Sequence, residues 1–276
     1  MKHHSILWSL VLAGLVLVGC TEVSSSVSSS SSASISSSEA DLIEFGTGYG
    51  LVHGHYVGIA TVETLNDVVT DITLDEFFLP YNWAKVALTD FQTYPDDVIA
   101  VVGTRGTSYY SKYITIGETL FTATAVVSGT AQIVNYAATD IPNLDAWVAT
   151  EANAIWYVEQ VEDEAFFLAT SAGLEHPNLV RTDVTSNNGM TKSTSGYWAQ
   201  SETVIRGWSG NMEAIIDAFI GTRLDFTIAS TDKTVATETE PAYWIVNGVA
   251  TGVTVTDFLD YYALLQRTYA NRAVAV

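Results

Sequence analysis

The chain has 276 residues, 31 of them acidic and 11 basic, and its formal net charge is −20 at pH 7. This acidic balance argues against binding to nucleic acid or to an anionic lipid surface, because both partners favour clusters of Lys and Arg. Cys20 is the only cysteine, so the chain has no internal disulfide and its apolar core must hold the fold together.

The first nineteen residues have the layout of a secretory signal peptide. A basic start at residues 1–4 precedes an apolar segment at 6–18, which is shorter than the ~20 residues of a spanning helix. Leu17-Val18-Gly19-Cys20 resembles the bacterial lipobox, in which the cysteine is lipidated. The alternative is an ordinary signal peptide with an incidental cysteine. We expect residues 1–19 to be a lipoprotein signal peptide and Cys20 to anchor the protein to the outer face of the cytoplasmic membrane.

A serine-rich segment follows the cysteine. Between Ser24 and Ser38, twelve of fifteen residues are serine. Such a segment buries too little apolar surface to offset its chain entropy. The sequence therefore predicts that residues 20–40 form a lipidated, disordered linker before the folded body.

From about Asp41 the pattern is mostly that of β-strands. Short runs rich in Val, Ile, Thr and Tyr alternate with turn residues. These runs are at 56–62, 68–74, 98–102, 120–127 and 131–136.

Three segments carry apolar residues at helical spacing. They are 143–162, preceded by Pro142, then 211–220, followed by Gly221, and 258–271, with Thr256 or Asp257 as N-cap. Strands followed by mixed helices and strands favour an α+β fold over a regular parallel sheet. We expect residues 41–276 to form a single compact α+β domain of mostly antiparallel strands with about three helices.

Two stretches resemble the FMN-binding domain of bacterial membrane-associated flavoproteins. The segment that begins Gly48-Tyr49-Gly50 and returns through His53-Gly54-His55 is similar to the opening hairpin of that domain. Gly248-Val249-Ala250-Thr251-Gly252-Val253-Thr254 is similar to its flavinylation motif, Asp-x-x-Ser/Thr-Gly-Ala-Thr, which precedes a helix. Gly248 replaces the acid of that motif and Val253 replaces the alanine.

The resemblance implies that a flavin transferase joins FMN, through its phosphate, to the hydroxyl of Thr254. Thr251 and Gly252 belong to the same motif, and a glycine there lets the backbone approach a bulky cofactor or the transferase. The phosphate would then lie near the start of the helix expected at 258–271, where free N–H groups and the macrodipole favour an anion.

A second segment, Lys192-Ser193-Thr194-Ser195-Gly196-Tyr197-Trp198, has Ser-Gly in place but a tryptophan at the acceptor position. Tyr197 or Trp198 could form an aromatic wall that stacks on a flavin ring. The alternative is an exposed loop anchored by a tryptophan in the core.

Two other groups of residues have side chains of types that bind metals or catalyse reactions. On a strand, His53 and His55 would share a face and supply two metal ligands, but no third ligand is near them in sequence. We expect them to line a pocket or face solvent. Acidic residues at 159–164 are typical of a solvated helix end. The chain has neither a Gly-x-Ser-x-Gly elbow nor a phosphate-binding P-loop.

Together with the expected lipid anchor, the resemblance implies a membrane-anchored extracytoplasmic flavoprotein that carries electrons with FMN in extracellular electron transfer. Its electrons would come from a membrane dehydrogenase or a quinone-linked donor, and it would be a redox carrier rather than a hydrolase or transferase. The main alternative is a solute- or glycan-binding lipoprotein, which would share the linker and the aromatic side chains. A third is a surface protein with only an interaction role.

Overall fold

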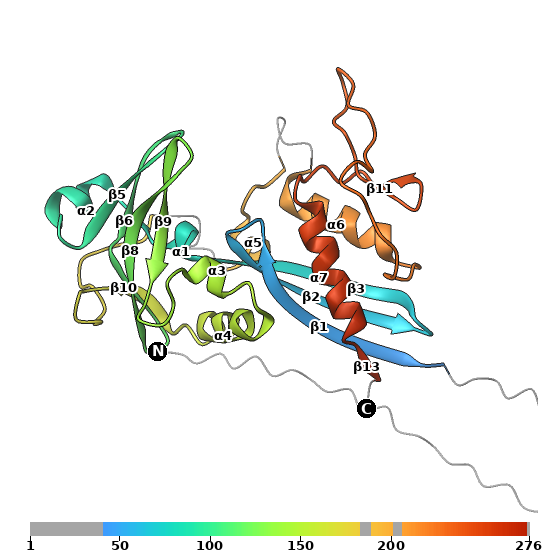
Figure 1. Cartoon of the computed structure of the whole chain (residues 1–276), viewed down its shortest axis with the longest axis horizontal. Helices are drawn as coiled ribbons and strands as arrows, with labels where there is room; N and C mark the ends of the chain where they lie inside the picture. Colours follow the sequence, from blue (N-terminus) through green and yellow to red (C-terminus); the bar gives the residue numbers. More distant parts are fainter. Residues whose placement is uncertain (1–40, 183–188, 201–205, 275–276) are drawn as a thin grey trace, which may run out of the picture. The chain divides into compact units, whose positions relative to one another are not determined.

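The computed structural model of this chain describes residues 41–182, 189–200 and 206–274 (Figure 1). The expected signal peptide, the expected lipidation site at Cys20 and the serine-rich linker lie outside the described residues. From Asp41 onward the described residues share one hydrophobic core, in which Trp83, Tyr157 and Phe258 are fully buried.

The strands form antiparallel sheets, as the sequence predicted. The first sheet has the order β13-β1-β2-β3, the second β10-β7-β8-β9, the third β4-β6-β5, and β11 pairs with β12. Their bounds are β1 Ile43–Val52, β2 Tyr56–Leu65, β3 Val68–Phe78, β4 Lys85–Val86, β5 Val98–Gly103, β6 Gly106–Ser111, β7 Tyr113–Ile116, β8 Thr119–Ser128, β9 Ala131–Ala137, β10 Phe166–Ala169, β11 Ile245–Val246, β12 Val249–Ala250 and β13 Ala273–Val274. The α+β class is therefore confirmed.

The number of helices differs from the expectation of about three. The described residues contain α1 Pro80–Trp83, α2 Leu88–Thr93, α3 Leu144–Trp147, α4 Glu151–Glu162, α5 Lys192–Ser195, α6 Gly207–Phe219 and α7 Phe258–Ala270. Only α4, α6 and α7 exceed six residues, and these are the three that have a recognisable apolar period. None of the helices in the described ranges has the length and apolarity of a membrane span.

The helix expected at 143–162 is interrupted. Asn143 caps the short α3 by accepting a hydrogen bond from Ala146 N at 2.8 Å. Asn153, in the first turn of α4, donates to the carbonyl of Trp147, the last residue of α3, at 2.8 Å. Asn143 thus caps the start of α3, and Asn153 satisfies the carbonyl of its last residue, so the chain can leave the helix between α3 and α4 at little cost.

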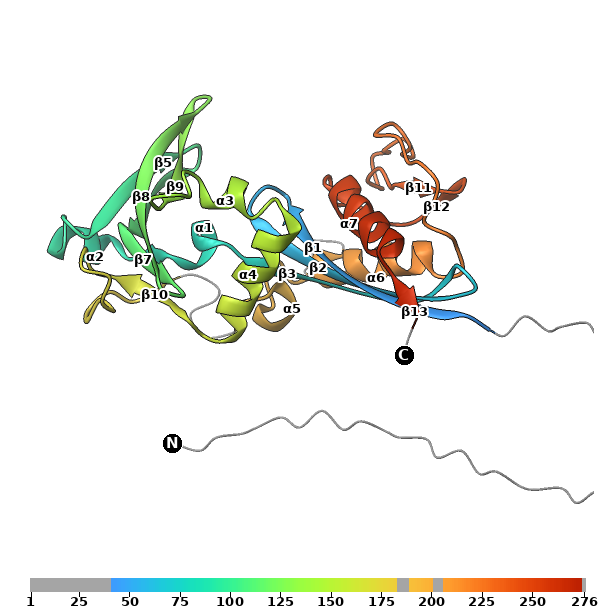
Figure 2. The same cartoon turned by 60° about the horizontal axis from the view of Figure 1, so that its bottom comes forward.

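Helix α7 packs closely on the first sheet because β1 presents glycines to it. Figures 1 and 2 show α7 lying along β1 and β2. A Cβ atom at Gly46 would lie 2.5 Å from the carbonyl oxygen of Thr268, and one at Gly48 would overlap the Thr268 hydroxyl. At Gly50 a Cβ would overlap the guanidinium of Arg267. The alternate glycines of β1 thus set the distance between the sheet and the helix that follows Thr254.

The other end of the same sheet is tied to α4 and α1. Tyr157, fully buried in α4, donates to the carbonyl of Phe78 at 2.5 Å and accepts from Trp83 Nε1 at 2.9 Å. These bonds fix the point where β3 ends and α1 begins. The sheet of β1, β2 and β3 therefore lies between helices that hold it at both ends, and it is a rigid base for the side chains it carries.

We predict that Gly48→Ala lowers the free energy of unfolding by about 1–3 kcal/mol, the usual range for overpacking a tight interface. The added methyl group overlaps the Thr268 hydroxyl and forces α7 away from β1. Urea unfolding followed by circular dichroism measures the loss. Adding Thr268→Ala to Gly48→Ala should recover part of it, and a double variant as unstable as the single one would contradict this packing account.

Candidate functional site

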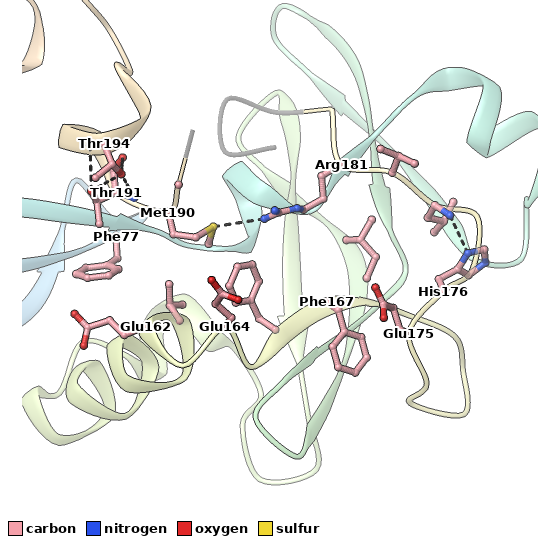
Figure 3. A pocket seen from close by; sticks show the side chains of 16 residues that line it. Phe77, Glu162, Glu164, Phe167, Glu175, His176, Arg181, Met190, Thr191 and Thr194 are labelled. Atoms are coloured by element: carbon pink, nitrogen blue, oxygen red, sulfur yellow. Dashed lines mark hydrogen bonds between the residues drawn. The ribbon is translucent and has the colours of Figure 1, made fainter. Parts of the chain in front are cut away.

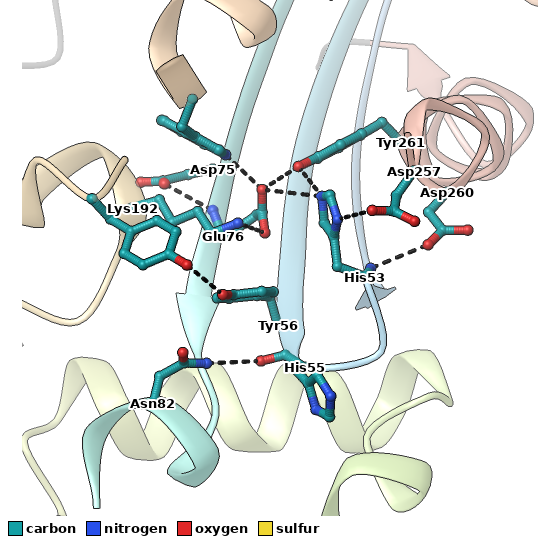
Figure 4. Close-up of polar contacts among 12 residues, drawn as sticks. His53, His55, Tyr56, Asp75, Glu76, Asn82, Lys192, Asp257, Asp260 and Tyr261 are labelled. Carbon is teal, nitrogen blue, oxygen red and sulfur yellow. Dashed lines mark hydrogen bonds and ion pairs between the residues drawn. The ribbon is translucent and has the colours of Figure 1, made fainter. Parts of the chain in front are cut away.

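Three of the residues predicted from two distant segments, Thr254, Tyr197 and Trp198, meet at one pocket of about 430 Å³. It lies where the β1–β2 turn, α5 and the start of α7 come together (Figure 4). Aromatic rings form most of the wall, and one ammonium and one imidazole are added to them. The lining residues are His53, Tyr56, Lys192, Tyr197, Trp198, Trp208, Thr254, Val255, Thr256, Asp257 and Tyr261.

Thr254 is half-buried and is held by α6. The side-chain oxygen of Asn211 accepts from Thr254 N at 2.7 Å and from its hydroxyl at 3.1 Å. Asn211 is fully buried, and its amide in turn donates to the carbonyl of Gly207 at 2.7 Å. The hydroxyl of Thr254 therefore has a fixed position at the pocket wall, although the sequence did not indicate its partner Asn211.

Tyr197 and Trp198 both line the pocket but have different environments. Tyr197 is partly buried, lies edge-on to Phe78 at 5.4 Å between ring centroids, and accepts a hydrogen bond from the hydroxyl of Tyr56 at 3.3 Å. Trp198 keeps 43% of its surface exposed and adopts a positive φ of 50°. Its carbonyl accepts from Trp208 N at 2.9 Å. Trp198 is thus an exposed ring at the rim, and Trp208 is the buried one.

Thr251 and Gly252 lie on the approach to the pocket and do not line it. The hydroxyl of Thr251 donates to the carbonyl of Trp244 at 2.9 Å and accepts from Val253 N at 3.1 Å, which fixes the turn. Gly252 has a φ of 77°, and a Cβ there would lie 2.5 Å from Nη2 of Arg206. The glycine is therefore required by the backbone conformation and by the Arg206 guanidinium.

A buried ion pair lies beside the pocket, and the sequence analysis missed it. Glu76 has no exposed surface, and its Oε2 lies 2.7 Å from Nζ of Lys192, which is 5% exposed. Glu76 Oε1 accepts hydrogen bonds from Trp208 Nε1 at 2.6 Å and from the hydroxyl of Tyr261. Three groups, from α5, α6 and α7, thus meet at one carboxylate of β3.

The sequence did contain a signal for Glu76. Ile72, Leu74 and Phe78 are at alternate positions along β3 and share its inward face. Glu76, between Leu74 and Phe78, belongs to the same alternation, so it also falls on the inward face. No comparable signal marks Lys192, which lies in a serine- and threonine-rich segment. It is placed by the backbone, because Phe78 N donates to the carbonyl of Met190 at 3.0 Å and so fastens this segment along β3.

His53 and His55 do not share a face, because they lie in the three-residue turn between β1 and β2 and not on a strand. His55 stacks on Tyr81 with 4.7 Å between centroids and lies 3.0 Å from Asp145. His53 points the other way, as Figure 4 shows, and lines the pocket. The prediction that the two imidazoles share a face was wrong, because side chains alternate between faces only within a strand.

His53 connects the turn to the first residues of α7. Its Nδ1 lies 2.5 Å from Asp257 Oδ2, and its Nε2 lies 2.5 Å from the hydroxyl of Tyr261. Its backbone N donates to Asp260 Oδ2 at 3.1 Å. Asp257 is at the N-cap position of α7 but makes no side-chain cap, because its carboxylate faces His53. No group of three or more His, Cys, Asp or Glu in the described ranges has the arrangement of a metal site.

Burial dominates the electrostatics of this site. It lowers the pKa of Lys192, and the charge and hydrogen bond of Glu76 oppose this effect. Burial also raises the pKa of Tyr56, with a further contribution from its hydrogen bond to Tyr197. The pKa of Tyr261 is raised by burial first and then by the charge of Glu76. The two tyrosines therefore stay neutral at physiological pH, and each keeps its hydroxyl proton.

A larger cavity of about 840 Å³ lies on the other side of α5 (Figure 3). Glu162 and Glu164, from the acidic run expected to be a solvated helix end, line it together with Glu175, Arg181 and Phe167. Gly189 and Met190 also line it, and they adjoin residues 183–188, which are outside the described ranges. None of the residues predicted from the flavinylation motif lies there.

No protein-family model, no curated protein and no solved structure matches this chain.

We predict that Lys192→Met lowers the free energy of unfolding by about 3–5 kcal/mol, because it leaves the Glu76 carboxylate buried without its counter-charge. Thermal or urea unfolding measures the change. The double variant Glu76→Gln with Lys192→Met removes both charges and should be more stable than Lys192→Met alone. Equal losses in the two variants would show that Lys192 acts through packing and not through the ion pair.

We predict a loss of stability above pH 10. The folded-state pKa values of Tyr56 and Tyr261 lie above the ordinary value of 10.0, so the unfolded chain loses these protons first and unfolding is favoured as pH rises. The lowered pKa of Lys192 acts in the opposite sense only up to its ordinary value of 10.5.

Tyrosinate absorbance and circular dichroism, recorded together against pH, check this expectation. Ionisation of the buried tyrosines should coincide with unfolding. Full ionisation of all tyrosines while the fold persists would contradict it.

Proposed function

We propose that this protein is a lipid-anchored extracytoplasmic flavoprotein that carries electrons with FMN bound in the pocket at Thr254. The observation that carries the proposal is that residues predicted from two distant segments line one pocket. Thr254 was selected from the flavinylation-like motif, and Tyr197 and Trp198 from a segment more than fifty residues earlier, yet all three line the same pocket. Unrelated segments would not be expected to meet in this way.

The size and chemistry of the pocket suit a flavin. Its volume of about 430 Å³ is within the range of roughly 300–1,000 Å³ that is usual for small-molecule sites. Tyr56, Tyr197 and Trp198 offer faces or edges for an isoalloxazine ring, and the exposed Trp198 leaves one side reachable from solvent. An electron carrier needs such an accessible edge to meet its donor and its acceptor.

The charges near the pocket are mixed, and Glu76 balances the ammonium of Lys192. Lys192 and His53 contribute positive or protonatable groups, and α7 begins at Phe258, four residues after Thr254. Asp257 and Asp260 oppose a phosphate at that helix end, although His53 offsets the charge of Asp257. Thr254 would hold the phosphate as an ester, so that binding does not depend on electrostatic attraction alone.

Bound FMN would supply the redox chemistry, and the protein would supply position and environment. Asn211 keeps the Thr254 hydroxyl at the wall, where a flavin transferase would form the phosphoester. The lipid on Cys20 and the serine-rich linker would let the body move between a membrane dehydrogenase or quinone-linked donor and an acceptor outside the membrane. The same aromatic pocket would also suit a sugar or another solute, which is the alternative that the experiment must separate.

The experiment is intact mass with visible absorbance on protein that is co-expressed with a flavin transferase and then denatured. We expect a yellow chain that is heavier by one FMN less one water, and an unmodified chain in Thr254→Ala. Thr256→Ala is the matched control, because it removes the neighbouring hydroxyl at the same pocket and should leave the modification intact.

A chain that is yellow only before denaturation would show non-covalent FMN and contradict the phosphoester. A colourless chain of unmodified mass would overturn the flavoprotein proposal. In that case, melting shifts with sugars and small solutes would test the binding-protein alternative.

A further inference from the structure

A continuous series of polar side chains, joined by hydrogen bonds and at its last step by an ion pair, runs from the surface to the pocket (Figure 4). It begins at Asp257, whose side chain is 44% exposed, and passes through His53 and Tyr261 to Glu76. It ends at Lys192, whose ammonium lies 2.7 Å from Glu76 and 3.6 Å from the centre of the Tyr56 ring. Stability alone does not explain this series, because buried ion pairs seldom add stability over apolar side chains.

The direction of each hydrogen bond follows from counting protons. Glu76 Oε1 accepts from both Trp208 and Tyr261, and Oε2 faces the Lys192 ammonium, so Glu76 is a carboxylate. Tyr261 has one proton and gives it to Glu76. Its oxygen must therefore accept the contact from His53, and Nε2 of His53 carries a proton.

The second nitrogen of His53 is also protonated. Nδ1 lies 2.5 Å from the carboxylate oxygen of Asp257, which has no proton to donate. His53 is thus an imidazolium between the carboxylates of Asp257 and Glu76, with Nε2 3.9 Å from Glu76 Oε1. The charged or titratable groups that face it are Asp257 at the N-cap of α7, Asp260 and Tyr261 from α7, Glu76 from β3 and Tyr56 from β2.

We propose that His53 is a proton store for the pocket, and that its proton is delivered through Tyr261, Glu76 and Lys192 to the ligand when that ligand is reduced. This inference rests on the proposed function, since it requires a redox-active ligand that gains a proton with its electrons. It assigns a role in proton delivery to four side chains that the flavinylation-like motif does not contain.

The transfer balances as follows for an electron pair supplied by a membrane dehydrogenase or a quinol. Lys192 gives one ammonium proton to the reduced ligand, so one N–H bond breaks and one bond to hydrogen forms on the ligand. Glu76, now without a counter-charge, takes the hydroxyl proton of Tyr261 and passes a proton to the Lys192 amine, which restores the ion pair. Tyr261 takes the Nε2 proton of His53, which is left neutral and keeps its Nδ1–H bond to Asp257. Oxidation of the ligand reverses each transfer.

The lowered pKa of Lys192 agrees with this role, because burial makes the ammonium a better proton donor than an exposed lysine. Lys192 also lines the pocket, so no further group is needed between it and the ligand. The raised pKa of Tyr261 keeps its oxygen protonated between transfers. Reduction would then require one proton fewer from bulk solvent as long as His53 is charged.

The first test needs no flavin. Nitrogen-15 chemical shifts of the imidazoles in the ligand-free protein at pH 7 should show both nitrogens of His53 protonated. His55 is the internal reference, because it lies in the same turn but faces Asp145. A neutral His53 tautomer would overturn the donor assignment and, with it, the store.

The second test counts protons. The flavin-loaded protein is reduced electrochemically in weakly buffered solution that contains a pH-indicator dye. The wild type and His55→Gln should take up about one proton fewer from bulk solvent, for each electron pair, than His53→Gln. Tyr261→Phe keeps the ring and breaks the series at its middle, so its proton uptake should match that expected for His53→Gln. It therefore tests the store independently if His53→Gln folds poorly.

The outcomes separate the two proposals. A colourless wild-type protein overturns both the flavoprotein function and the store. A yellow wild-type protein that takes up as many protons as His53→Gln and Tyr261→Phe overturns the store alone. A lower uptake in the wild type and in His55→Gln than in the other two variants supports it.

Discussion

The carboxylate of Glu76 is the constraint on which the site depends. A charge with no exposed surface is tolerated only when its oxygens are paired, and here the partners come from three different helices. Trp208 comes from α6, Tyr261 from α7 and Lys192 from α5. Satisfying one buried charge therefore fixes three helices relative to β3, and the pocket is the space enclosed between them.

The glycines of β1 allow α7 to lie close enough to the sheet for these contacts to form. Because Gly46 and Gly48 have no side chains, α7 approaches the sheet closely enough for Tyr261 to reach Glu76 and for Asp257 to reach His53. A helix held further out by larger residues would break these contacts. Gly48 and Gly50, which belong to the segment that suggested a family resemblance, thus have a direct packing role against α7 in this chain.

The sequence predicted the parts of the fold that depend on local periodicity. The strands at 56–62 and 68–74 and the helix at 258–271 are present because each has a clear alternating or helical apolar pattern. The helix expected at 143–162 was continuous by period, but Asn153 satisfies the carbonyl of Trp147 at a break that periodicity cannot reveal.

For the site, the sequence indicated Thr254, Tyr197 and Trp198, which line the pocket, whereas Thr251 and Gly252 shape its approach. The Glu76–Lys192 pair could not be predicted, since it joins residues more than a hundred positions apart whose contact is decided by the β3 backbone. The role of His53 was hidden for a similar reason. Its direction depends on the turn conformation, which is not encoded by alternation.

The central claim is that the pocket enclosed around Glu76 and Lys192 holds a flavin attached at Thr254. The most direct measurement is a crystal structure of the protein purified after co-expression with a flavin transferase. The account predicts continuous density from the Thr254 hydroxyl oxygen through a phosphate to an isoalloxazine ring, with that ring between Tyr197 or Trp198 and the Lys192 ammonium. Density for a ring elsewhere, or a pocket that contains only solvent in a yellow protein, would contradict it.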